Sequence, residues 1–257
     1  MREIGLIRHG AKFEGGKKRV PLEESGLTAE QQERWAEAVE RLDIQNDPEL
    51  SYDSVPQIEK LAARLNESLP ERATVLFLSS DYPRTKLTAD LLSSSLIGEV
   101  QKAGKDVGVG FVWEPKEEAA KPGSVSKLPQ GTPEIMEAMK EVAERDYPDD
   151  ESLKEYFISN DGSITHPKED ELVMKAVNEQ ISDKDSFIGK RVALLKEQVE
   201  NLKAKFPSGD RPVYVYGIGH HGSLIALDVA YNGRDKYDSV DEIPKPLSLW
   251  KVNLEKI

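Results

Sequence analysis

The segment EIGLIRHG (3–10) is a short apolar run that ends in Arg8, His9 and Gly10, and VYVYGIGHHG (213–222) has the same form near the other end of the chain. Apolar runs of this length that lead into a glycine-containing turn are typical of strands buried in a sheet. TVLFLS (74–79) predicts a third strand, and VGVGFVW (107–113) predicts a fourth that its two glycines weaken. The sequence therefore predicts four strands spread over the length of the chain.

Between these strands the apolar residues recur at helical spacing, which predicts helices over 27–42, 55–69, 84–96 and 187–206. Thr28 is the expected N-cap of the first of them. Strands that alternate with helices indicate a parallel sheet with helices on both faces. We expect an α/β protein, built as a three-layer α/β/α sandwich around a mostly parallel central sheet.

Composition excludes several classes of protein. The chain has 257 residues with 38% hydrophobic and 32% charged residues, which is typical of a globular protein and not of a disordered one. No stretch approaches the length of a membrane span, and Arg8 interrupts the N-terminal apolar run too early for a signal peptide. The absence of cysteine excludes disulfides and thiolate sites and fits a cytoplasmic protein. The net charge of −12 argues against general nucleic-acid binding.

The region from about 115 to 186 breaks the alternation and is rich in Pro, Gly, Asp and Glu. Two short helices, at about 132–145 and 169–181, are expected within it. We interpret this region as an irregular insertion in a single domain that spans 1–257. It covers the edge or the active face of the sheet, where substrate-facing loops occur, or it is a surface excursion without function.

Three of the four histidines follow predicted strands. His9 ends the first strand, while His220 and His221 end the strand near 213–218. Ligands of open α/β sheets bind at this carboxyl edge. Arg84 lies in SSDYPRTKLTADLL (79–92), after the third strand, where Asp81 is expected to cap a helix that begins near Pro83. An arginine there opposes the helix dipole, so anion binding explains it better than local stability does.

Taken in order, LIRHG, SSDYPRTKLTADLL and VYGIGHHGSLIAL resemble the three signature segments of the histidine phosphatase superfamily, in its phosphoglycerate mutase-like branch. The resemblance implies a phosphoglycerate mutase-like fold. LTAEQQERW (27–35) resembles a further family segment, but Gln31 stands where the family has glycine.

The resemblance also implies roles for individual residues. His9 would be the nucleophile that forms a phosphohistidine, and Arg8, Arg84 and His220 would hold the phosphoryl oxygens. His221 occupies a position where the family usually has glycine, and it either lines the phosphate pocket or is exposed. The resemblance implies no metal and no cofactor.

The family usually takes its proton donor from the loop after the strand that follows the Arg84 helix. Here VWEPKEEAAKPG (112–123) offers Glu118, with Glu117 and Glu114 as alternatives. A carboxyl group in this role should have a raised pKa. An acidic loop in contact with solvent is the competing interpretation for each of the three glutamates.

The expected activity is metal-independent hydrolysis of a small phosphorylated substrate. A phosphoglycerate mutase is the alternative, but RHGAKFEGG (8–16) lacks the serine and asparagine that mutases carry after this motif. A non-catalytic phosphate-binding protein is the third interpretation, and the presence of His9 argues against it. We expect no nucleic-acid or membrane partner, and the sequence does not indicate an oligomeric state.

Overall fold

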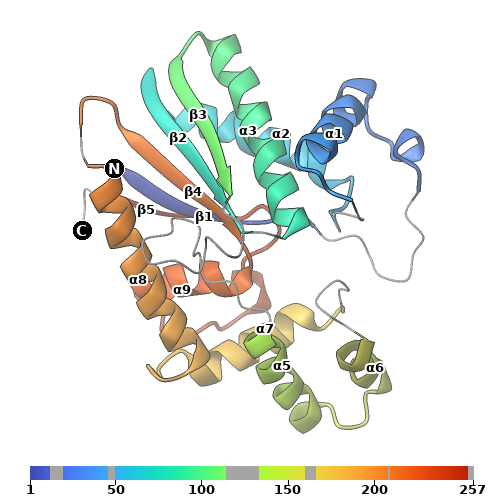
Figure 1. The fold of residues 1–257 in the computed structure, drawn as a ribbon. Helices are drawn as coiled ribbons and strands as arrows, with labels where there is room; N and C mark the ends of the chain where they lie inside the picture. Colours follow the sequence, from blue (N-terminus) through green and yellow to red (C-terminus); the bar gives the residue numbers. More distant parts are fainter. Residues whose placement is uncertain are drawn as a thin grey trace.

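The computed structural model describes residues 1–11, 20–45, 50–80, 82–113, 133–159, 166–207 and 209–253. Figure 1 shows its helices and strands, which run in the order β1 (Glu3–Arg8), η1 (Leu22–Glu24), α1 (Ala29–Arg41), α2 (Ser54–Ser68), β2 (Arg72–Ser79), α3 (Pro83–Ala103), β3 (Asp106–Trp113), α5 (Pro133–Asp146), α6 (Glu151–Ser159), α7 (Glu169–Gln180), α8 (Phe187–Lys205), β4 (Val213–Gly219), α9 (His221–Asn232), η2 (Val240–Glu242) and β5 (Leu249–Asn253). Within the described ranges, no helix combines the length and the apolar character needed to cross a membrane.

The five strands form one sheet in the order β3-β2-β4-β1-β5. All neighbouring pairs are parallel except β1 and β5, which are antiparallel. The register pairs Arg8 with Gly219 and Ser79 with Ile218, so β1, β2 and β4 end at the same level. This arrangement brings the residues that follow these three strands to one carboxyl edge.

Helices cover both faces of the sheet. Successive residues of each strand point to opposite faces, and the apolar side chains on each face form a core with the helices that lie over it. One core joins α1, α2 and α3 to the face that carries Ile7, Phe77 and Tyr216. The other joins α8 and α9 to the opposite face, which carries Leu6 and Val215. Figure 1 shows the two groups of helices on either side of the strands. The predicted α/β/α sandwich with a mostly parallel sheet is confirmed.

Apart from the two 3-10 helices, η1 and η2, one strand and one helix were not expected from the sequence. β5 adds an antiparallel edge strand beside β1, and its register pairs Ile7 with Leu249. α6 lies within the insertion. Both are short, and their few apolar residues give too little periodicity to distinguish a strand or a helix from a loop.

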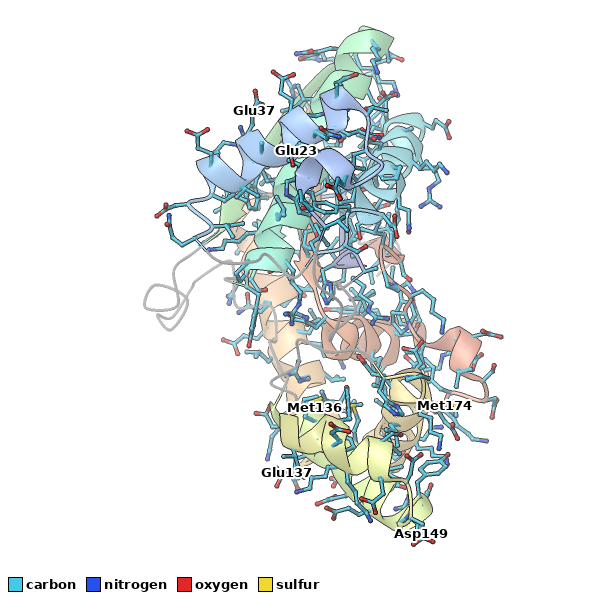
Figure 2. All side chains as sticks on the ribbon, turned by 90° about the vertical axis from the view of Figure 1, so that its right-hand side faces the viewer. Glu23, Glu37, Met136, Glu137, Asp149 and Met174 are labelled. Atoms are coloured by element: carbon cyan, nitrogen blue, oxygen red, sulfur yellow. The ribbon has the colours of Figure 1, made fainter. Side chains whose placement is uncertain are left out.

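The insertion is more regular than the sequence suggested. Its described part consists of three helices, α5, α6 and α7, that share a buried core with residues of α8, α9 and the segment before β5. Met136 on α5 and Met174 on α7 pack against this core. Figure 2 places these two residues and Asp149 at the end of the molecule opposite Glu23 and Glu37. The two helices expected here are present as α5 and α7, and α6 is a third that was not expected. Apolar residues at helical spacing give each of the three a buried face.

Local capping follows the sequence at α1 and departs from it at α3. Thr28 caps α1, and its partner in a capping box is Gln31, so Gln31 has a structural role in starting this helix. The N-cap of α3 is Tyr82, not Asp81, and Pro83 occupies the first turn. Asp81 lies outside the described residues. Proline suits this position because the first N–H groups of a helix have no partner within the helix.

Candidate active site

His9 follows directly after β1, at the carboxyl end of the sheet and beside β4. Its backbone N–H donates to the carbonyl oxygen of Gly219 at 3.0 Å, which extends the β1–β4 ladder by one residue beyond Arg8. The next residue is tied to α3, since the N–H of Gly10 donates to Thr88 Oγ1 at 3.2 Å. The imidazole is only 2% exposed. The fold thus holds His9 firmly at the edge where α/β proteins bind ligands.

The hydrogen bond of the His9 ring decides which nitrogen can react. Nδ1 lies 2.6 Å from the carbonyl oxygen of Gly10. A carbonyl oxygen can only accept, so Nδ1 carries the proton, and in the neutral ring Nε2 then carries the lone pair. Burial lowers the pKa of His9 well below its ordinary value, and the nearby His220, Arg84 and Arg8 lower it further. His9 is therefore neutral at pH 7 and presents a nucleophilic Nε2.

Arg8 is buried beside His9, and one side of its guanidinium is bound to the protein. Nη1 donates to the carbonyl oxygen of Pro244 at 2.6 Å and lies 3.8 Å from Asp170 Oδ1. Within the described part of the chain, no acceptor lies within hydrogen-bond distance of the buried Nε. Burial lowers the pKa of Arg8 to about 10, and the charges of Asp170 and Glu169 oppose this shift. Arg8 remains a cation at neutral pH.

Arg84 reaches the same edge from the first turn of α3. Its side chain is buried, and its guanidinium carbon lies 5.0 Å from the centre of the Tyr82 ring. The carbonyl oxygen of Arg84 accepts from Thr88 Oγ1 at 2.7 Å, and this is the hydroxyl that also binds the N–H of Gly10. Thr88 therefore connects the turn that follows His9 to the turn of α3 that carries Arg84.

His220 completes the group. It is the N-cap of α9, and its ring centre lies 4.9 Å from that of His9 with the two planes at 66°. The ring of Tyr82 contacts His220 edge-on at 5.2 Å. The N–H groups of the first turn of α9 and the positive end of its dipole lie at the same place. Two arginines, two histidines and a helix N-terminus thus converge on one small region.

This arrangement suits a phosphoryl group chemically. Guanidinium groups bind phosphate oxygens through parallel hydrogen bonds, and a helix N-terminus favours anions. A neutral imidazole beside them can attack phosphorus, while the cations take up charge in the transition state.

Some predicted site residues lie outside the described part of the structure. These are the three candidate proton donors Glu114, Glu117 and Glu118. The backbone of His221 begins α9, but its side chain also falls outside the described residues. Their roles stay predictions.

Sequence reasoning missed three residues near the site. Tyr82 contacts both Arg84 and His220, and its place next to Pro83 in the second motif was the signal that could have identified it. Asp170 comes from the insertion and lies beside Arg8. Arg191 of α8 is buried over the Phe187 ring at 4.4 Å, and a side chain at position 222 would meet its Nη1 at 3.2 Å. Only the tertiary fold brings Asp170 to Arg8, and only the tertiary fold brings Arg191 to the first turn of α9.

Comparison with known proteins gives likenesses of structure alone. No family model matches this chain, and no curated protein does. Among solved structures, it is similar to a mycobacterial glucosyl-3-phosphoglycerate phosphatase, with 15% identity over 98% of this chain and 90% of that one and a TM-score of 0.37. It is also similar to the phytase of D. castellii (10% identity, 96% and 64% covered, TM-score 0.42) and to that of Hafnia alvei (11%, 97% and 79%, 0.40). At these values the likeness does not decide what this chain does, and the function follows from the site.

Proposed function

We propose that this protein is a phosphatase that hydrolyses phosphate monoesters through a phosphohistidine on His9. The observation that carries the proposal is the placement of the His9 ring 4.9 Å from that of His220, with Arg8 and Arg84 buried at the same edge of the sheet. The resemblance of the three sequence segments to histidine phosphatases supports the same conclusion. Binding of a phosphoryl group is sufficient to explain why two arginines and two histidines are brought together there.

In the first step, Arg8, Arg84 and His220 bind the oxygens of the phosphoryl group. His9 Nε2 attacks phosphorus, a P–N bond forms, and the P–O bond to the alcohol breaks with its electron pair on the leaving oxygen. The fixed cations stabilise the charge that collects on the phosphoryl oxygens, and phosphoryl transfer depends mainly on such positioning. The Nδ1–H bond to Gly10 holds the ring as positive charge develops on it.

The leaving oxygen requires a proton, and we assign it to Glu118, with Glu117 or Glu114 as the alternatives. In the second step, water attacks phosphorus, the P–N bond breaks, and inorganic phosphate leaves. The carboxylate that gave its proton in the first step can take one from this water. We propose that the reaction proceeds without a metal ion or a cofactor.

The test is hydrolysis of p-nitrophenyl phosphate in EDTA by the wild type, by His9→Ala and by His166→Ala. We expect the His9→Ala protein to lose turnover and to fold normally, because His9 follows a strand and contributes a ring rather than apolar packing. His166 is the matched control, since it is a half-buried histidine of the insertion that contacts Ser152 and Tyr156 instead of the site. Its variant should retain activity.

Activity of the His9→Ala protein equal to that of the wild type would contradict the proposal. A second measurement separates an enzyme of narrow specificity from a binding protein. If the wild type does not turn over p-nitrophenyl phosphate, calorimetry with vanadate and inorganic phosphate shows whether the pocket binds an anion. Binding without turnover of a panel of phosphorylated metabolites favours the non-catalytic alternative. Transfer of phosphate to a second phosphoglycerate position instead of to water favours the mutase.

We propose a small phosphorylated molecule as the substrate and the cytoplasm as the location. The basis for the location is the absence of cysteine, which fits a reducing compartment. A local cluster of cations in a chain of net charge −12 attracts a small anion without attracting a polyanion such as nucleic acid.

A further inference from the structure

The insertion contributes a carboxylate to the phosphate pocket. α7 begins with Glu169, Asp170 and Glu171, and the second of these lies with Oδ1 3.8 Å from Nη1 of Arg8. Asp170 is 162 residues from Arg8 in the sequence and belongs to a helix of the insertion, outside the sheet. Its presence at the site requires an explanation beyond the packing of α7, because the apolar residues of that helix, such as Leu172, already anchor it.

Asp170 is held in place from its other side. Lys245 Nζ lies 2.7 Å from Asp170 Oδ2 and also donates to the carbonyl oxygen of Val240 at 3.1 Å. The neighbouring residue, Pro244, provides the carbonyl oxygen that accepts from Arg8 Nη1 at 2.6 Å. Asp170 and the segment 240–245 therefore enclose the Nη1 side of the Arg8 guanidinium.

The guanidinium is planar, so fixing one side sets the direction of the other. The buried Nε of Arg8 has no acceptor among the described residues. An Arg side chain binds phosphate best through two parallel N–H groups, and this requires a defined plane. We infer that Asp170 is a positioning residue that holds Arg8 by its Nη1 side and so directs its Nε edge to the phosphoryl oxygens, an inference that rests on the phosphatase function proposed above.

The distance and exposure of this pair indicate orientation rather than stability. At 3.8 Å the two atoms are too far apart for a hydrogen bond, and the Asp170 side chain is 32% exposed. Such a pair adds little to global stability. Asp170 also repels a phosphate group, so its loss should not weaken binding of the ground state. The step that suffers is the transition state, in which Arg8 must meet an oxygen of growing charge.

The experiment compares Asp170→Asn with Glu171→Gln. Both remove one negative charge from the first turn of α7, but Glu171 lies 3.3 Å from Lys175 and accepts from the hydroxyl of Tyr147, away from Arg8. With p-nitrophenyl phosphate we expect kcat to fall about tenfold in Asp170→Asn with KM nearly unchanged, since small misplacements of a catalytic group cost this much or more. Glu171→Gln should keep both constants, and Asp170→Glu should recover part of kcat.

Vanadate binding tests the inference apart from turnover. Vanadate adopts the geometry of the transition state, so Asp170→Asn should bind it about tenfold more weakly than Glu171→Gln does. Equal kcat and equal vanadate affinity in the two variants would overturn the positioning role. A higher vanadate affinity in Asp170→Asn would overturn it also, since Asp170 would then compete with the anion. A wild type that binds vanadate without hydrolysing p-nitrophenyl phosphate or any of the panel of phosphorylated metabolites would count against the proposed function alone, and a wild type that does neither would overturn both.

Discussion

At the scale of single residues, the site places cations where the rest of the chain is acidic. The protein has a net charge of −12, yet the guanidinium groups of Arg8 and Arg84 are buried beside His9. A buried cation loses hydration, and a neighbouring cation raises that cost further. An anion that binds among these groups removes both penalties. Burial lowers the pKa of His9, and the neighbouring charges lower it further, so the surroundings that would favour an anion also keep the imidazole neutral.

The lowered pKa of His9 predicts a pH dependence of stability. In the unfolded chain His9 gains a proton near pH 6.5, whereas in the folded protein burial opposes protonation and His220, Arg84 and Arg8 oppose it further. Above pH 6.5, His9 is neutral in both states and its titration does not affect the free energy of unfolding. As the pH falls below 6.5, the unfolded chain binds a proton at His9 that the folded protein resists, so the free energy of unfolding decreases. We expect the thermal midpoint of the wild type to drop more between pH 7.5 and 5.5 than that of His9→Gln.

The check is thermal unfolding of both proteins at the two pH values, with the difference between them attributed to position 9. All other titratable groups are shared, so the contribution of those that do not interact with position 9 cancels. A drop that is equal in the two proteins would mean that position 9 takes up protons alike in the folded and unfolded states.

The four residues of the site that could be predicted share one property. Each of them lies at the end of a strand or at the start of the helix that comes next, so local sequence alone gives the place of Arg8, His9, Arg84 and His220 at the carboxyl edge. Asp170 could not be predicted, because nothing near it in the sequence indicates where α7 docks. The same holds for Arg191, whose position depends on how α8 packs against the first turn of α9.

At the scale of elements, the helices of the core were predictable and their ends less so. Apolar spacing gave α1, α2, α3 and α8 because each buries one face against a sheet core. The expectation for α3 stopped at 96, but the helix continues to Ala103. Gly98 lies inside it, and a glycine there lowers helix propensity without breaking the hydrogen-bond ladder. The true end is Gly104, which adopts the left-handed conformation with φ of 69°.

Two glycines of the helices predict opposite effects of substitution by alanine. A Cβ at Gly98 meets nothing within 4 Å, whereas one at Gly189 would lie 2.4 Å from the carbonyl oxygen of Asp183 and 2.5 Å from that of Lys184. Gly98→Ala should stabilise the protein by about 0.5–1 kcal/mol. Gly189→Ala should destabilise it by about 1–3 kcal/mol, because the start of α8 must move away from a rigid backbone.

Urea unfolding measures both free energies in one experiment, and each variant is the control for the other. The chemical change is the same in the two proteins and both sites are helical, so helix propensity alone predicts stabilisation in both. If Gly189→Ala were as stable as Gly98→Ala, this result would contradict the close contact between the turn at 183–184 and the start of α8.

At the scale of the whole molecule, the three groups of buried side chains are joined rather than separate. α8 contributes residues to the sheet core and, through Ile188, to the core of the insertion, and α9 does the same through Ile225. Tyr237 and Ile243, from the segment before β5, are buried in the insertion core as well. α7 therefore packs on elements that the sheet itself requires. The insertion and the sheet should unfold as one unit.

Replacing Leu172 by Ala tests this cooperation. Leu172 is fully buried in the insertion core, and removal of such a side chain costs about 2–5 kcal/mol. Trp35 lies in the core on the far side of the sheet, whereas Trp250, on β5, packs against the insertion core and against the core of α8 and α9, so its fluorescence also responds to loss of the insertion contacts. In two backgrounds that each retain one of these tryptophans, with phenylalanine at the other tryptophan positions, Leu172→Ala should lower the fluorescence midpoint in urea by the same amount.

Ile158→Ala is the matched control, since this residue also belongs to the insertion but is 87% exposed, and its variant should keep both midpoints. A Leu172→Ala protein whose Trp250 signal changes at lower urea than its Trp35 signal would show that the insertion unfolds by itself. In that case Asp170 would leave the pocket while the sheet remained folded, and the orientation of Arg8 would depend on an equilibrium within the native protein. A single shared midpoint would instead show that the insertion and the residues around His9 unfold as one cooperative structure. The contact between Asp170 and Arg8 would then be lost only when the whole protein unfolds.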